Sequence, residues 1–386
     1  MTVASASALP AHGRPPLSAR LVFPHGHESS PEENVISRLG AGRTACLASW
    51  IFAIMLAVPA ATPPTWTLRL AIHYLPPANS RSQYDVMFAW PGQVWFLGGS
   101  NIFGHGKPKA ERLMNGIPQA LPLPTGAHSW ITAASAPSRT DIWAVTYLGG
   151  SVLEWNGSVW KTAPRGNWNT GTRFTGITAL GPTNVWVFGT SGRRFPGAGT
   201  WHFNGTSWTR VNGVAGGIFQ ASAAAKTDIW GIGNEGRTGN ALLHFGGSAW
   251  RRVRPQALAG FTYTHVLALS RSNVWVEGSV AGVPKLGRFN GRVWTELRMP
   301  GRTPGTGMCR DGHAGMWVIA NSGAAPSIVR DRSRTGIWTT SVVSHNAANE
   351  VLACALTPGT TRAWGAGKAS APQGSAAAAY RAGRSA

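Results

Sequence analysis

The residues that could take part in binding chemistry are mainly cations, together with one aromatic side chain in a polar segment. Trp168 stands between two asparagines in such a segment, and Arg165 and Arg173 flank it. An exposed indole beside guanidinium groups can stack on a sugar ring or a base while the cations hold an anion. The alternative is that Trp168 folds over an edge of the structure and contacts no ligand. The other predicted ligand-binding residues are cations in similar segments, namely Lys107, Lys109, Arg193, Arg194 and Arg237.

Acidic and histidine side chains give no comparable pattern. Of the 14 acidic residues, three lie in the first 43 positions and the other 11 are scattered along the chain. Glycoside hydrolysis needs two carboxylates that face each other across the substrate, and no such pair can be identified. Asp311 with His313 is the nearest polar cluster, and a turn explains it. His105, His265 and His345 show no metal-ligand spacing, and no nucleophile elbow or phosphate loop is present. We therefore predict no catalytic residue, no metal and no cofactor.

The overall charge points to anionic partners. The formal net charge is +21 and the pI is about 11.5. Such a field attracts acidic polysaccharide, other anionic polymers or anionic lipid. Nucleic acid stays among the partners that the charge allows, and so does a protein. The alternative explanation for the high positive charge is a genome of high GC content, because such a genome encodes arginine often.

A short stretch that ends in tryptophan recurs along the chain. It reads turn, β-branched or apolar residue, then Trp, as in Thr183-Asn184-Val185-Trp186. The seven copies end at Trp95, Trp143, Trp186, Trp230, Trp275, Trp317 and Trp364. The intervals between them are 48, 43, 44, 45, 42 and 47 residues. A steady period of this length is typical of the blades of a β-propeller.

A second signature divides each repeat into two hairpins. It reads aromatic-Asn-Gly-x-x-Trp, and its copies end at Trp160, Trp208 and Trp294, with Gly for Asn in the copy that ends at Trp250. Asn-Gly between β-rich flanks is a strong hairpin signal, and it predicts a type I′ turn. Each repeat therefore reads as four antiparallel strands, A to D. The seven repeat Trp residues should fill the gaps between neighbouring blades.

The seventh repeat ends one strand short, after Gly383. The segment Thr65-Trp66-Thr67-Leu68-Arg69-Leu70 is similar to the D strands of other repeats, such as the one that begins at Trp208. We therefore predict that residues 65–71 supply strand D of the last blade. Such a strand closes the ring and removes its free edges.

Residues 1–43 are polar and rich in Pro, Ser and Ala, which predicts a disordered leader. Residues 44–61 contain an apolar run, from Ala45 to Val58, that is preceded by arginines and followed by small residues. This pattern predicts the core of a signal peptide, or alternatively an uncleaved signal anchor that is the one contact with a membrane. Residues 62–386 then form the propeller. Export predicts an extracellular or cell-envelope location.

Two cysteines, Cys309 and Cys354, lie at similar positions in neighbouring repeats, 8 and 10 residues before the repeat Trp. We expect both on inner strands, as two buried free thiols. A disulfide is the alternative that export would permit.

These repeats resemble those of bacterial exported seven-bladed β-propellers, whose blades read D-V-W-A-V-G followed by an aromatic-x-G-x-x-W hairpin. The resemblance covers residues 65–386. It implies the fold but no set of functional residues. The B–C and D–A connections share one face of such a ring, and the predicted site residues all fall in or beside them. We expect a non-catalytic binding module for carbohydrate or an anionic surface polymer. The alternatives are a protein-interaction scaffold at the cell envelope and, third, a propeller-type glycoside hydrolase or lyase.

Overall fold

The computed structural model describes most of the chain beyond position 64. The described residues are 65–72, 82–100, 106–169, 171–189, 199–211, 217–234, 240–311, 315–322, 325–333, 336–345, 349–358, 360, 363–371 and 374–383. The predicted leader (1–43) and the predicted signal segment (44–61) lie outside them. Within the described ranges, no helix has the length and apolarity that a membrane crossing needs. The helix identified there is one short 3-10 turn, η1 (Gln256–Leu258).

The strands of the first four blades follow one another in chain order. Blade 1 consists of β2 (Ser82–Trp90), β3 (Gln93–Ser100), β4 (Lys107–Met114) and β5 (Ile117–Ala120). Blade 2 consists of β6 (Ile131–Ser138), β7 (Asp141–Thr146), β8 (Val152–Trp155) and β9 (Trp160–Thr162). Blade 3 consists of β10 (Phe174–Ala179), β11 (Val185–Gly189), β12 (Thr200–Phe203) and β13 (Trp208–Val211). Blade 4 consists of β14 (Ile218–Ala225), β15 (Asp228–Asn234), β16 (Asn240–Phe245) and β17 (Trp250–Val253).

The last three blades complete the ring. Blade 5 consists of β18 (Thr262–Ser270), β19 (Asn273–Val280), β20 (Val283–Phe289) and β21 (Trp294–Arg298). Blade 6 consists of β22 (Gly307–Arg310), β23 (Met316–Ser322), β24 (Ala325–Arg332) and β25 (Trp338–Ser344). Blade 7 consists of β26 (Glu350–Leu356), β27 (Ala363–Ala371), β28 (Gly374–Gly383) and, from the other end of the sequence, β1 (Thr65–Ile72).

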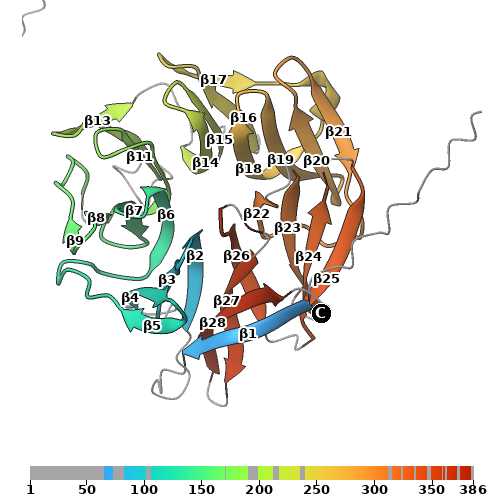
Figure 1. The fold of residues 1–386 in the computed structure, drawn as a ribbon. Helices are drawn as coiled ribbons and strands as arrows, with labels where there is room; N and C mark the ends of the chain where they lie inside the picture. Colours follow the sequence, from blue (N-terminus) through green and yellow to red (C-terminus); the bar gives the residue numbers. More distant parts are fainter. Residues whose placement is uncertain are drawn as a thin grey trace, which may run out of the picture. The chain divides into compact units, whose positions relative to one another are not determined.

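The seven sheets form the predicted all-β, seven-bladed propeller, in which the first strand of each blade lies innermost (Figure 1). Side chains and backbone groups join these inner strands across blades. The Gln220 side chain accepts the backbone N–H of Val266 at 2.7 Å and donates to its carbonyl at 3.0 Å. Similarly, the backbone N–H of Ala179 donates to the Ser135 hydroxyl at 2.9 Å. These bonds satisfy inner backbone groups that have no strand partner on that side.

The prediction of how the ring closes is confirmed. β1 pairs antiparallel with β28, with Trp66 opposite Ala382 and Leu68 opposite Tyr380. The predicted closing segment, residues 65–71, ends one residue before the observed strand does. Because β1 precedes blade 1 and completes blade 7, the two ends of the propeller are joined by a ladder of hydrogen bonds (Figure 1).

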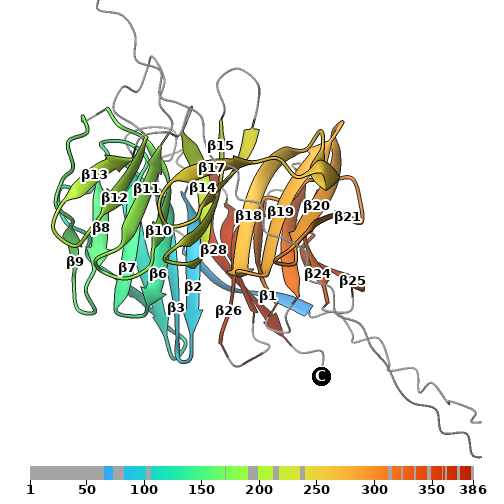
Figure 2. The same cartoon turned by 90° about the horizontal axis from the view of Figure 1, so that it is seen from above.

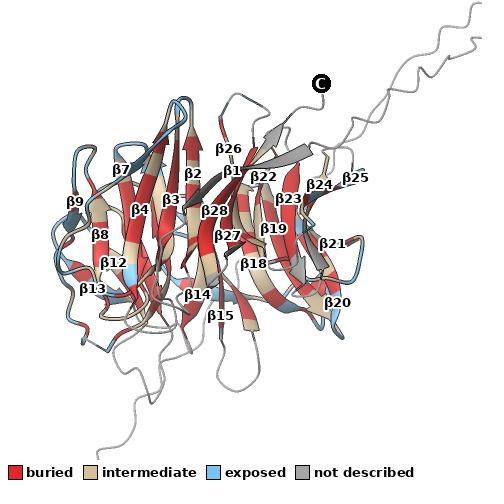
Figure 3. Ribbon diagram, turned by 90° about the horizontal axis from the view of Figure 1, so that it is seen from below, coloured by how far each residue is buried: buried red, intermediate tan, exposed pale blue. Residues whose placement is uncertain are grey.

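The repeat tryptophans are buried between blades, as predicted. Trp186 of blade 3 contacts Phe245 of blade 4, with ring centroids 4.7 Å apart, and also Trp250 at 6.0 Å. Trp230 contacts the corresponding residues of blade 5 in the same way. The two sequence signatures are therefore complementary, because the Trp of one blade packs against the aromatic pair of the next blade's C–D hairpin. In Figure 3 the buried residues lie mainly along the strands.

The C–D turns differ from the prediction. A type I′ turn with positive φ at both positions occurs at Asn115-Gly116, where φ is 49° and 88°. In the other Asn-Gly turns glycine alone has positive φ, and the asparagine side chain accepts backbone N–H groups, as Asn204 does from Thr206 and Ser207 at 2.9 Å. Asparagine is favoured there because its carboxamide forms an Asx turn. The turn glycine also lies directly against the A–B turn of the same blade.

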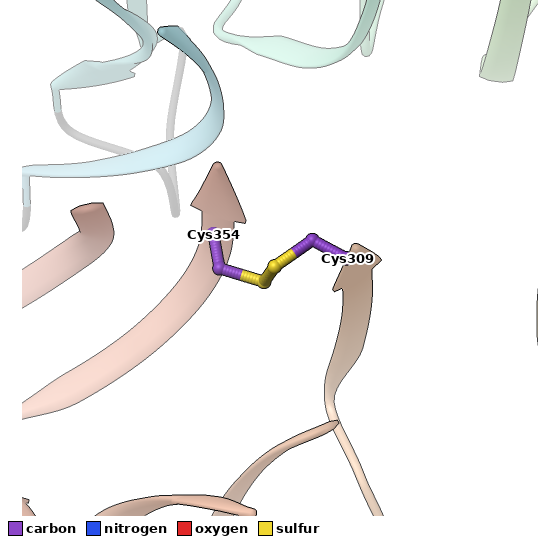
Figure 4. The surroundings of a disulfide bond; sticks show 2 residues. All are labelled: Cys309 and Cys354. Carbon is purple, nitrogen blue, oxygen red and sulfur yellow. A yellow bond between two sulfur atoms is a disulfide. The ribbon is translucent and has the colours of Figure 1, made fainter. Parts of the chain in front are cut away.

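The expectation of two free thiols is wrong, because Cys309 and Cys354 form a disulfide. It joins the inner strands β22 and β26 of blades 6 and 7 (Figure 4). Both cysteines lie on inner strands, as predicted. The bond forms because neighbouring inner strands converge, so that residues at similar positions in successive blades come within reach of each other.

Alternating strand direction places the strand ends that lead into the B–C and D–A connections at one end of the blades, and those that lead into the A–B and C–D turns at the other (Figure 2). We call the first end the loop face and the second the turn face. The described site residues predicted from the sequence belong to the loop face or to strands that start there.

Candidate functional site

Trp168, the centre of the predicted site, is a core residue and not an exposed platform. Its side chain is 4% exposed. The indole packs edge-on against Phe174, Trp201 and Trp208 at centroid distances of 5.1, 5.3 and 5.4 Å. Its N–H donates to the carbonyl of Gly150 at 2.9 Å. The prediction of an exposed indole is therefore wrong, because Trp168 fills the seam between blades 2 and 3.

The two arginines that flank Trp168 have different roles. Arg165 is exposed, and its guanidinium donates to the Trp168 carbonyl at 3.2 Å. Arg173 is half-buried, donates to the Tyr147 hydroxyl at 2.7 Å and lies over the Tyr147 ring at 4.7 Å. Tyr147 in turn stacks on Trp130, with centroids 4.4 Å apart. The loop face thus does carry an aromatic and cationic array, but it is built on Trp130 and Tyr147.

An open pocket of about 580 Å³ lies beside this array, at the seam between blades 1 and 2. We call it the seam pocket. Its walls are the start of β4, the D–A connection between blades 1 and 2, and Leu148 of the next B–C connection. The lining residues are Gly106, Lys107, Pro108, Leu123, Pro124, Thr125, Ala127, His128, Ser129 and Leu148. Trp130 follows Ser129 and Tyr147 precedes Leu148, so the aromatic array adjoins the pocket wall.

Polar groups of the seam pocket suit an anionic or hydroxyl-rich ligand. Lys107 and His128 are both exposed, and both can donate hydrogen bonds. The D–A wall is tied to the neighbouring loop, because the Ser151 hydroxyl donates to the Gly126 carbonyl at 3.2 Å. Gly99 allows Trp130 to approach β3 closely, since a side chain on Gly99 would collide with Trp130. A fixed concave wall with a few polar groups and apolar surface between them is typical of ligand sites.

Lys109 lies two residues beyond Lys107 on β4, but in a different environment. It is buried, and burial lowers the pKa of its amine to about 8, an effect that the negative charge of Glu111 opposes. Burial also raises the pKa of Glu111, while a hydrogen bond from Tyr84 lowers it. Lys109 is therefore part of a buried polar cluster, and it does not line the seam pocket.

The structure brings together only part of the predicted site. Lys107 lines the seam pocket and Arg173 joins the array beside it, whereas Trp168 and Lys109 are buried. Arg193, Arg194 and Arg237 lie outside the described residues. Sequence reasoning missed His128, Trp130 and Tyr147. The sequence did hold a signal for them. His128 and Trp130 lie in a D–A connection just before an apolar strand, and Tyr147 lies in a B–C connection just after one.

Comparisons with known proteins support the fold. The sequence matches no protein-family model and no curated protein. Similar solved structures include YCF48 bound to D1 peptide, which is 13% identical with a TM-score of 0.58, over 84% of this chain and 98% of that one. A catalytically inactive histidine-to-alanine variant of virginiamycin B lyase from Staphylococcus aureus with quinupristin is 11% identical with a TM-score of 0.58, over 81% and 99%. The GH74 xyloglucanase from Xanthomonas campestris is 12% identical with a TM-score of 0.53, over 81% and 55%. At these identities the likeness concerns the propeller fold alone.

Proposed function

We propose that this propeller is an exported binding module that holds carbohydrate or another anionic polymer on its loop face, at the seam pocket. The observation that carries the proposal is the pocket wall itself, which Lys107 and His128 line. The stacked rings of Trp130 and Tyr147 belong to the chain neighbours of two other lining residues, Ser129 and Leu148. Aromatic rings bind the apolar faces of sugars, while cations bind carboxylate, sulfate or phosphate groups.

Two further observations support the parts of the proposal that concern partner and location. The net charge of +21 favours anionic polymers over neutral ones. The disulfide between Cys309 and Cys354 suits an oxidising compartment, and the apolar run from Ala45 to Val58 suits export. An extracellular or cell-envelope location follows as part of the same proposal.

Binding of the full chain to acidic and neutral polysaccharides tests the proposal. We expect polygalacturonate or heparin to bind and neutral xyloglucan to bind more weakly. The affinity for the acidic polymer should fall about tenfold or more between 50 and 500 mM NaCl, because salt screens exposed charges. Retention of no acidic polymer at low salt would contradict the proposal.

Variants locate the site. Lys107→Gln and Arg173→Gln should each weaken acidic-polymer binding about 3- to 10-fold, since each removes one cation near the pocket. Arg139→Gln is the matched control, because Arg139 is an exposed cation in the A–B turn of blade 2, on the turn face. An equal loss in Arg139→Gln would mean that net charge, and not the seam pocket, holds the polymer.

A protein-interaction scaffold is the second candidate, and exposed apolar residues on the turn face favour it. Val159, Val293 and Ile337 are 58%, 57% and 65% exposed, and each precedes the first Trp of a D strand. Exposed apolar side chains can mark partner surfaces. Substitution of Val159 and Ile337 by Asp should abolish partner capture from envelope extracts without changing polymer binding if this candidate is right.

A further inference from the structure

Blade 5 departs from the repeat at one core position. The residue two places after the repeat Trp is apolar and fully buried in six blades, and these residues are Leu97, Val145, Phe188, Ile232, Ile319 and Ala366. In blade 5 the same position holds Glu277, which is equally buried at 0% exposure. Placing a carboxylate in a core position costs free energy unless partners compensate for the lost hydration. The six other blades are built without a carboxylate at this position.

The Glu277 carboxylate is held from two sides. One oxygen, Oε2, lies 3.0 Å from Nδ1 of His265, and the other accepts the backbone N–H of Gly305. A side chain on Gly305 would collide with this carboxyl group. Arg330 of blade 6 is also buried nearby, where burial lowers its pKa and the charge of Glu277 opposes that effect. The carboxylate therefore has one fixed orientation, directed at His265.

His265 is the partly accessible member of the pair. Its side chain is 24% exposed, against 0% for Glu277. It lies on the innermost strand β18, next to the bulge that separates Tyr263 from His265 in the register with β19. Because a carboxylate accepts a hydrogen bond, it holds the neutral imidazole with the proton on Nδ1 and the lone pair on Nε2, at the far edge of the ring.

Within the part of the chain that the structure describes, the other histidines that form hydrogen bonds to polar side chains are His202 and His244. His202 and His244 occupy equivalent positions on C strands, opposite Trp186 and Trp230. They stack on these indoles at centroid distances of 4.4 and 4.3 Å, and Nε2 of each already faces a side-chain oxygen. The inner-strand residues that follow the bulge in other blades do not titrate, for example Val86 and Ala133. His265 therefore has no counterpart in the scaffold.

We propose that His265 is a general base and Glu277 its positioning residue, in a proton-transfer site on the innermost strand of blade 5. A matching substrate class is an ester or similar acyl compound, because its hydrolysis requires a proton to move from water to the leaving oxygen. Nε2 takes the proton of water or of a substrate hydroxyl, while the oxygen of that water or hydroxyl bonds to the acyl carbon. The bond from that carbon to the leaving oxygen then breaks, and the leaving oxygen receives the proton from Nε2. No electron transfer or cofactor is required, and the imidazole ends as it began.

Hydrolysis of p-nitrophenyl acetate by the full chain tests this inference. The intact protein should release p-nitrophenolate faster than the same concentration of imidazole in solution does. In His265→Gln this excess rate should be at least about tenfold smaller. His244→Gln is the matched control, since His244 also pairs with a carboxylate, that of Asp228, at 2.8 Å. A folded His265→Gln protein with the original rate, or an intact protein no faster than free imidazole, would overturn the inference.

Glu277→Gln separates positioning from a merely structural role. The glutamine carbonyl still accepts a hydrogen bond from Nδ1–H, but it lacks the negative charge that stabilises the ring as Nε2 takes up a proton. We therefore expect kcat to fall about tenfold with KM unchanged, and an unchanged kcat would count against the pair. Should His265→Gln fail to fold, carbethoxylation of the unaltered protein replaces it. Activity must then fall in step with modification of His265, and full modification without loss of activity would refute the site.

Discussion

Replacement of Trp168 by alanine distinguishes a core residue from a ligand platform. The indole is 4% exposed and touches three other aromatic rings edge-on. Removal of a buried aromatic side chain costs about 3–5 kcal/mol, and the surrounding backbone cannot refill the space easily. The hydrogen bond to the Gly150 carbonyl, at 2.9 Å, is lost as well. We expect the free energy of unfolding to fall by about 4 kcal/mol.

Urea denaturation and thermal unfolding of the full chain measure this loss. For a propeller of this length each kcal/mol lowers Tm by about 1.5 °C, so the expected decrease is about 6 °C. Trp168→Phe should lose less, about 1–2 kcal/mol, because a ring remains while the N–H donor is removed. Arg165→Ala is the control from the same loop. Its side chain is exposed, and its loss should change stability by less than about 0.5 kcal/mol.

The result that would refute the reasoning is specific. If Trp168→Ala unfolds within about 1 °C of the unaltered protein but loses polymer binding, Trp168 contacts ligand and does not hold the seam between blades 2 and 3. If stability falls by the expected amount and binding at the seam pocket persists, its role as a core residue is confirmed.

Three further outcomes follow from other parts of the ring. Reduction of the disulfide between Cys309 and Cys354, which are 45 residues apart, should destabilise the protein by about 4 kcal/mol from loop entropy, seen as a lower urea midpoint in dithiothreitol. Burial raises the pKa of Asp85 to about 7, so the folded state holds a proton that the unfolded chain releases near pH 4. Stability should therefore fall as pH rises from about 4 to 7, and Asp85→Asn should be more stable at pH 8, by at most ~4 kcal/mol, yet unchanged at pH 4. Deletion of residues 65–72 should expose the edge of β28, which size-exclusion chromatography would detect as association and a melting curve as a lower Tm.

The parts of the fold that were predictable depend on local periodicity. The spacing of residues such as Trp186 and Trp230 identifies the blades because each blade repeats the same two hairpins. The closing strand was predictable because residues 65–71 resemble other D strands, and a ring has one vacant place for such a strand. Both predictions rest on local sequence patterns, and neither depends on how close the blades lie to one another in space.

The features that sequence reasoning missed depend on contacts between distant segments. Trp168 lies in a polar stretch, but the direction of its side chain is set by Gly150 and Gly166, which leave room for the indole. The bond between Cys309 and Cys354 depends on how closely the inner strands of two blades converge.

The seam pocket is a third feature of this kind. Three segments from two blades form it, namely the start of β4, a D–A connection and a B–C connection, so charge alone could identify Lys107 but not its neighbours. The departure at Glu277 was visible in principle, because aligning the repeats shows a single carboxylate among apolar residues.

Hydrogen–deuterium exchange on the full chain, with and without bound acidic polymer, tests the central claim most directly. The claim is that ligand binds on the loop face at the seam between blades 1 and 2. We predict slower exchange in peptides that cover residues 123–130 and 147–151, with no change in the turns at residues 138–141 and 156–159. Slower exchange confined to those turns would place the ligand on the opposite face and contradict the account.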